Sequence, residues 1–81
     1  MDTTPAQVLF TQAIGSNARC VKVILSRRSA GHYLLQKQLV SSGITLYDKT
    51  EERINTDFES EAIETLHAIK ILHELVNLAG C

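Results

Sequence analysis

The sequence predicts an all-α protein: an antiparallel helical hairpin with a possible short N-terminal helix, in one helical domain over residues 1–81. Two observations lead to this prediction. Apolar residues recur with helical spacing through residues 54–76, and glycines stand where the long apolar segments end. A single core in so short a chain supplies only about 3–5 kcal/mol, so we expect contact with a partner to add stability.

A compact start signal predicts the short first helix over residues 4–14. Thr4 offers an N-cap hydroxyl, Pro5 suits the first helical position, and Gln7 stands three residues after the cap. Gly15 would end this helix. A helix of about ten residues is marginal in isolation, so it would have to pack on another element.

The second predicted helix runs over residues 16–40 and ends at the segment Ser-Ser-Gly. Projected at about 100° per residue, its apolar residues fall within roughly half of the circumference. Gly31 lies in the middle of that face, where close approach of another helix would offset its cost of about 1 kcal/mol. The alternative is a turn at residues 29–31 that splits the segment in two.

Residues 43–47 connect this helix to a long last helix, for which two starts compete. The apolar register from Ile54 to Val76 favours a single helix over residues 48–79, with Gly80 as its stop. The run Asn-Thr-Asp at residues 55–57 is instead typical of an N-cap, and it would begin the helix at Phe58.

The last helix is apolar around more than half of its circumference. A helix that packs on one neighbour needs an apolar stripe of only a little over 100°. The surplus predicts that this helix contacts a second protein chain. The residues expected at this partner-binding surface are Ala68, Ile71, Leu72, Leu75 and Leu78.

No side-chain pattern predicts catalysis, and we expect no metal and no cofactor. The histidines and cysteines lack the ligand spacing of a zinc site. Cys20 falls on the apolar face of its segment, as is typical of a structural thiol, and Cys81 is interpreted as an incidental free thiol. His67 and His73 project about 120° apart on the last helix, so they do not converge on one site.

Charge is unevenly distributed along the chain, although the net charge is only −1. Residues 1–42 carry five basic and one acidic side chain, and residues 43–81 carry three basic and eight acidic ones. We interpret the basic segment as facing the acidic one. Glu61 and Glu64 suit the positive end of the last helix.

The hydropathy pattern predicts a cytoplasmic protein with reduced thiols and no membrane insertion. No stretch approaches the roughly 20 apolar residues of a membrane span. The start of the chain, residues 1–5, is acidic and lacks the basic region of a signal peptide.

The run Glu-Ala-Ile-Glu at residues 61–64 is followed by Ile69, Ile71 and Leu72, after a long first helix and a glycine-containing turn. This arrangement resembles the YscE/SsaE-type small helical-hairpin proteins of type III secretion. The resemblance covers roughly residues 16–80 as a pattern of length, turn position and helix character. It implies an α-hairpin in the bacterial cytoplasm that binds a tetratricopeptide-like chaperone of the needle subunit.

The sequence therefore predicts a small protein-binding module and not an enzyme. In this interpretation it is a co-chaperone or assembly partner that packs an apolar helical face on another helical protein or on a second copy of itself. No small-molecule substrate is expected. The alternative is a homodimeric helical-bundle transcriptional regulator that contacts DNA through its basic second helix, since basic side chains bind phosphates. The pairing of the basic segment with the acidic one is the favoured interpretation, so nucleic acid is not expected as a partner.

Overall fold

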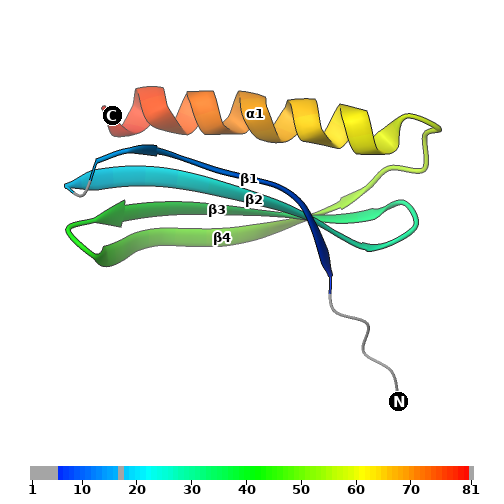
Figure 1. Ribbon diagram of the computed structural model, residues 1–81, viewed down its shortest axis with the longest axis horizontal. Coiled ribbons are helices and arrows are strands. Elements are labelled where there is room, and N and C mark those ends of the chain that lie inside the picture. Colours follow the sequence, from blue (N-terminus) through cyan, green and yellow to red (C-terminus); the bar gives the residue numbers. More distant parts are fainter. Residues whose placement is uncertain (1–5, 17, 81) are drawn as a thin grey trace, which may run out of the picture.

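The computed structural model describes residues 6–16 and 18–80, which form a four-stranded antiparallel sheet with one C-terminal helix (Figure 1). The elements are β1 (Gln7–Gly15), β2 (Arg19–Ser29), β3 (His32–Ser41), β4 (Ile44–Ile54) and α1 (Ser60–Ala79). Each strand pairs with the next, so the order across the sheet is β1-β2-β3-β4. The predicted all-α helical hairpin is wrong. The resemblance to the YscE/SsaE-type helical-hairpin proteins is wrong with it, and the chaperone and secretion roles that it implied have no support.

The middle of the sheet forms because apolar residues alternate with a period of two. Val21, Val23 and Leu25 stand at every second position of β2 and are fully buried, as are Tyr33 and Leu35 on β3. β-Branched side chains such as valine favour the pleated, half-buried surface of a strand. The predicted second helix over residues 16–40 is wrong because apolar residues also occur on the other face of β2, and they make the alternation resemble a helical stripe.

Glycines that were interpreted as helix ends or packing contacts lie in hairpin turns. Ala30 and Gly31 join β2 to β3, as the alternative of a turn at residues 29–31 required. Gly31 has a φ of 73°, and a Cβ there would lie 3.0 Å from Cγ2 of Thr56. Gly43, with a φ of 81°, joins β3 to β4. A left-handed backbone conformation favours glycine at both places.

β1 occupies the described part of the predicted first helix. Residues 4 and 5, which carry the helix start signal, lie outside the described residues. The pairing of β1 with β2 shifts register between Val8 and Phe10, so Leu9 is the extra residue of a β-bulge. Leu9, Phe10 and Ile14 are partly buried and pack against the core. Burial against β2 and the helix therefore outweighs the local helix signal.

α1 ends as predicted, but it begins much later than the periodicity suggested. Gly80 adopts a left-handed conformation and donates its N–H to the carbonyl of Val76, which confirms the predicted stop. The predicted helix over residues 48–79 is wrong in its first part, because residues 48–54 belong to β4. The rival start at Phe58 lies two residues from the observed one.

Two side-chain-closed turns lead into α1. Oδ1 of Asn55 accepts a hydrogen bond from the N–H of Asp57 at 3.0 Å, and Oδ1 of Asp57 accepts one from the N–H of Glu59 at 2.8 Å. Such turns stop β4 and redirect the chain onto the sheet. In the described part of the chain, no helix combines the length and the apolar character that a membrane span requires.

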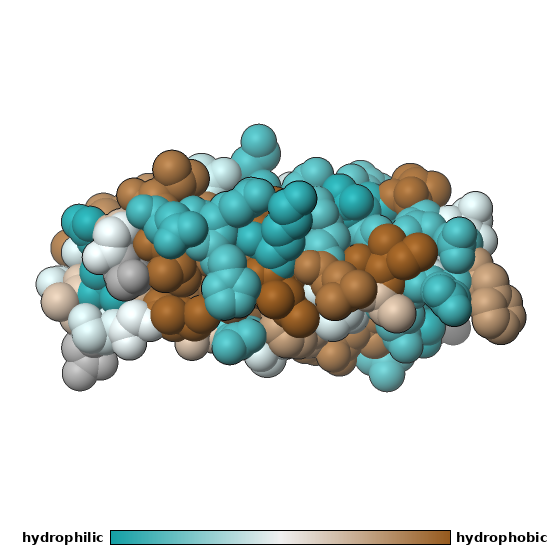
Figure 2. Space-filling view, turned by 90° about the horizontal axis from the view of Figure 1, so that it is seen from above, coloured by the Kyte–Doolittle hydropathy of each residue, from teal (hydrophilic) through white to brown (hydrophobic). Residues whose placement is uncertain are grey.

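α1 runs along the length of the sheet (Figure 1). It packs chiefly on β2 and less on β1 and β3, which flank β2. Ala68 and Leu72 point into the core and are 0% exposed. The backbone of β4 lies beyond the reach of the helix. Seen from the helix side, hydrophobic side chains lie beside hydrophilic ones along the molecule (Figure 2). One helix therefore covers only part of a four-stranded sheet.

Candidate functional site

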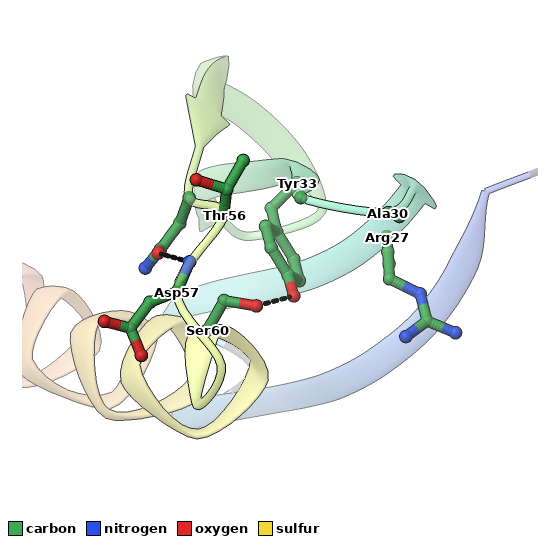
Figure 3. A pocket seen from close by; sticks show the side chains of 8 residues that line it. Arg27, Ala30, Tyr33, Thr56, Asp57 and Ser60 are labelled. Carbon is green, nitrogen blue, oxygen red and sulfur yellow. Dashed lines mark hydrogen bonds between the residues drawn. The ribbon is translucent and has the colours of Figure 1, made fainter.

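A polar pocket of about 290 Å³ lies where α1 begins, between the β2–β3 turn and residues 55–57 (Figure 3). Tyr33 and Ser60 point toward each other, with 2.7 Å between their hydroxyl oxygens. The guanidinium of Arg27 points away from them and lies 3.4 Å from a carboxylate oxygen of Glu61. These polar groups bind one another within the chain, so we interpret the pocket as a structural junction between sheet and helix.

Beside this pocket, Glu64 is a charged residue with only 1% of its surface exposed. It accepts hydrogen bonds from Nε of Arg53 and, at 3.0 Å, from Nδ2 of Asn55. Burial raises the pKa of the Glu64 carboxyl, but these bonds and the charge of Arg53 outweigh that effect and hold the pKa below its ordinary 4.5. The hydrogen bond to Glu64 correspondingly raises the pKa of Arg53. The pair ties β4 to the helix and is structural.

A second hollow lies at the other end of α1, over β2, β3 and β4, and has a volume of about 350 Å³. We call it the Leu78 groove. The residues that line it are Val21, Leu39, Tyr47, Leu75, Leu78 and Ala79. Its polar side-chain group is the Tyr47 hydroxyl; the rest of the lining side chains are apolar.

The Leu78 groove is open because the helix lies over β2 and stops short of β4. Tyr47 of β4 pairs with Leu39 of β3, so their side chains share the helix-bearing face of the sheet. Leu78 reaches out from the last turn of α1 above them and is 85% exposed, and Tyr47 is 42% exposed. Large apolar side chains therefore face solvent on the face of the sheet that elsewhere forms the core.

The same face of β4 changes character along the strand. Glu51, further along, binds both Lys37 at 3.5 Å and Arg53 at 3.4 Å. Near the start of α1, the part of the sheet that the helix does not cover therefore carries charged side chains that pair with one another. Near the end of α1, Ile44, which pairs with Ser41 on that face, is exposed instead, as Tyr47 is. Exposed apolar side chains beside an open hollow are typical of a surface that binds another molecule.

The five predicted partner-binding residues separate into three environments. Ala68 and Leu72 lie in the core, and their side chains contact the chain's own sheet. Ile71 and Leu75 are partly buried and pack against that core, whereas Leu78 is exposed. The structure brings Leu75 and Leu78 together in the Leu78 groove. It does not bring the other three to that groove.

The sequence did not reveal that Leu39 and Tyr47 line the groove. Leu39 was assigned to the predicted second helix and Tyr47 to the connection that follows it. Their pairing across β3 and β4 depends on a strand register that a helical projection does not contain. Residues 33–39 gave only a weak alternation signal, because Leu34 and Lys37 interrupt it. Sequence reasoning also missed the bond between Glu64 and Arg53, for the same reason.

The residues considered for catalysis are dispersed. Cys20 follows the alternation of β2 to the face opposite the helix, where its thiol is partly buried, so its predicted place on an apolar helical face is wrong. Nε2 of His67 is buried, whereas His73 is exposed. Residues 6–16 and 18–80 contain no group of three or more His, Cys, Asp or Glu side chains that could hold a metal ion. Cys81 lies outside the described residues.

The predicted basic second helix is β2 and most of β3. Arg27 of β2 pairs with Glu61 of α1, and Lys37 of β3 pairs with Glu51 of β4. These side chains are engaged with acidic partners on the helix-bearing side of the sheet. The helical bundle of the alternative DNA-binding interpretation is therefore wrong as a fold.

Comparisons with family models, with curated proteins and with solved structures found no match to this chain. Its fold and groove define a small antiparallel β-sheet protein with one covering helix and an open apolar end. Its function is inferred from its own residues.

Proposed function

We propose that this chain is a non-catalytic protein-binding module that takes an apolar segment of another protein into the Leu78 groove. The observation that carries this proposal is the incomplete cover of the sheet: Leu78 and Tyr47 stay exposed where α1 ends. Burying a large apolar side chain that was exposed contributes about 1.5–3 kcal/mol. A partner that covers both side chains would gain a binding free energy of useful size from this groove.

The chemistry of the groove favours a protein partner over a small molecule. Small-molecule sites combine an apolar hollow with several convergent polar groups that fix the orientation of the ligand. Here Leu39, Leu75 and Leu78 offer none, and Tyr47 offers a single hydroxyl. A mainly apolar groove beside a helix suits the apolar side of an amphipathic helix, which docks through residues spaced three and four apart.

We propose the cytoplasm as the place where this binding occurs. The thiol of Cys20 is free, and free thiols persist in reducing compartments.

A pair of matched variants tests the groove. Leu78→Glu places a charge in it, and Asn77→Glu adds the same charge one residue away on the exposed side of α1. We expect the tagged wild-type chain and Asn77→Glu to retain the same co-purifying protein from the cells that make it, and Leu78→Glu to lose it. Retention of that protein at the wild-type level by Leu78→Glu would contradict the proposal.

A further inference from the structure

The outer edge of β1 carries an inference beyond the proposed function. We propose that two copies of this chain pair antiparallel along β1 and form one continuous eight-stranded sheet with both helices on the same face. This surface lies on the opposite flank of the helix from the Leu78 groove, so the two proposals can fail independently.

The two edge strands of the sheet differ in how they are protected. β4 carries five charged side chains, whereas the nine residues of β1 include neither a charged residue nor a proline. In the described part of the chain, β1 pairs with β2 alone. An edge strand leaves a row of backbone N–H and C=O groups unpaired, and monomeric proteins usually guard such an edge with charges or proline. β4 is guarded in this way and β1 is not.

β1 can pair with β1 of a second copy in a register that keeps the core-facing side chains of both strands on the same face of the sheet. Beyond the bulge, residues 10–14 pair regularly with β2. An antiparallel pairing centred on Gln12 sets Phe10 of one copy opposite Ile14 of the other, and residues directly opposite share a face. Phe10 and Ile14 both pack against the core, on the helix side of the sheet. This register therefore joins the two apolar cores.

The flank of α1 above β1 supplies further apolar side chains. At about 100° per residue, Ile69 and Val76 lie roughly 160–180° around the helix axis from Leu78. Leu78 stands on the side of the helix that faces β4. Ile69 and Val76 therefore lie on the β1 side, where both are only partly buried. Leu66, 68% exposed, stands next to them toward the outer surface.

The spacing of such a dimer leaves a gap that these side chains fit. Each helix lies over its own β2, so three strand spacings of about 4.8 Å place the helix axes about 14 Å apart. Helices in direct contact lie about 8–10 Å apart. Phe10 and Ile14 would fill the gap from below, on either side of the two Gln12 side chains on the same face, and Ile69 and Val76 from both sides. In the monomer this apolar surface remains unpaired.

The flank is long enough to approach the area of a specific dimer. The 20 residues of α1 span about 30 Å, and a helix layer on a sheet is about 20 Å high. Contact along this whole flank would bury about 600 Å² per copy, or about 1,200 Å² in total, which is the lower limit of specific interfaces. The backbone hydrogen bonds between the two β1 strands add directional pairing to that area.

Charge variants at Gln12 test the pairing, because the two Gln12 side chains lie opposite each other at its centre. Gln12 is exposed, so Gln12→Lys and Gln12→Glu leave the fold intact. Like charges directly opposite destabilise a strand pair, and we expect each variant alone to dimerise about tenfold more weakly at low salt. An equimolar mixture restores the dimer through the Lys–Glu pair. Thr50→Lys, on the edge strand β4, is the matched control and stays dimeric.

Light scattering on size-exclusion chromatography reads the result for the full chain. At about 100 µM chain and a wild-type Kd of about 10 µM, we expect mostly dimer for the wild type and Thr50→Lys. Each Gln12 variant alone should be about half monomer, and their mixture should again be mostly dimer. A monomeric wild type at about 100 µM, about tenfold above a Kd of about 10 µM, would overturn the proposal. Gln12→Lys that is as dimeric as the wild type, or a mixture that is no more dimeric than either variant alone, would equally overturn it. None of these outcomes changes binding in the Leu78 groove.

Discussion

Arg53, one residue before the end of β4, donates a hydrogen bond from its Nε to the buried carboxylate of Glu64 on α1. Glu64 stands in line with Ala68 and Leu72 on the buried side of the helix. The helix backbone does not lie over β4, so this side-chain bond is a link between the helix and the edge strand. It fixes one end of the uncovered sheet and leaves the other end, with the Leu78 groove, open.

Removing Arg53 and removing Glu64 should lower the free energy of unfolding by different amounts. Arg53→Met leaves the Glu64 carboxylate buried with Asn55 alone, and an uncompensated buried charge costs about 3–5 kcal/mol. Glu64→Gln leaves Arg53 behind, and the side chain of Arg53 is partly exposed and can reach water. We expect a loss of about 1–2 kcal/mol for Glu64→Gln, measured by urea denaturation.

Glu51→Gln is the control for that pair of variants, because Glu51 also binds Arg53 but is more exposed. An exposed ion pair contributes about 0–1 kcal/mol, so we expect a correspondingly small loss of stability. Equal losses for Arg53→Met and Glu51→Gln would show that the bond to Glu64 is not the important one.

Acid should weaken the fold through Glu64. The pKa of Glu64 is lower in the folded chain than its ordinary value of 4.5, so the unfolded chain takes up the proton more readily as the pH falls. The stabilisation is fully present above about pH 4.5 and is lost as the pH falls through the folded pKa. Urea denaturation between pH 3 and 6 should show wild type and Glu64→Gln converging in acid. A constant difference in stability would contradict this assignment.

The hairpin glycines offer a test of local packing. Gly31→Ala and Gly43→Ala both place a side chain on a left-handed backbone, which costs about 1 kcal/mol. At Gly31 the new Cβ would also lie 3.0 Å from Thr56, whereas at Gly43 it meets nothing within 4 Å. We expect thermal unfolding to show the larger loss for Gly31→Ala, by about 1 kcal/mol. Equal losses would mean that residues 55–56 move aside freely.

The two sides of α1 should respond differently to truncation. Leu72 is fully buried, so Leu72→Ala should cost about 2–5 kcal/mol of unfolding free energy. Leu78 faces solvent, and Leu78→Ala should change stability by less than about 0.5 kcal/mol. Urea denaturation of both variants measures the difference. A cost above 2 kcal/mol at Leu78 would show that this side chain belongs to the core and is not available to a partner.

The last helix and its stop could be predicted from the sequence, and the sheet could not. The apolar register through Ile69 and Val76 is helical in fact, and Gly80 ends it as expected. In β2, however, Val21 and Ile24 lie on opposite faces of a strand although their spacing also suits one face of a helix. Such a segment becomes a strand because β1 and β3 are available to pair with it, which is a tertiary effect.

In the Leu78 groove, too, the residues on the helix could be predicted from the sequence and the residues on the strands could not. Leu75 and Leu78 belong to the helix and were recognised from the width of its apolar face. Ala68 and Leu72 belong to that face too, but the sheet covers them. A helical projection gives the direction of a side chain and does not tell which directions a neighbouring layer fills. Leu39 and Tyr47 reach the groove through strand register, which requires the fold.

Site-specific photo-cross-linking tests the protein-binding proposal most directly. A photoreactive phenylalanine derivative replaces Leu78 in the groove, or Asn77 on the exposed side as the control, and the cells that make the chain are irradiated. We predict a discrete adduct with one other protein from position 78, which is absent from position 77 and is lost when Tyr47→Glu is added. Equal adducts from both positions, or none from position 78, would contradict the proposal.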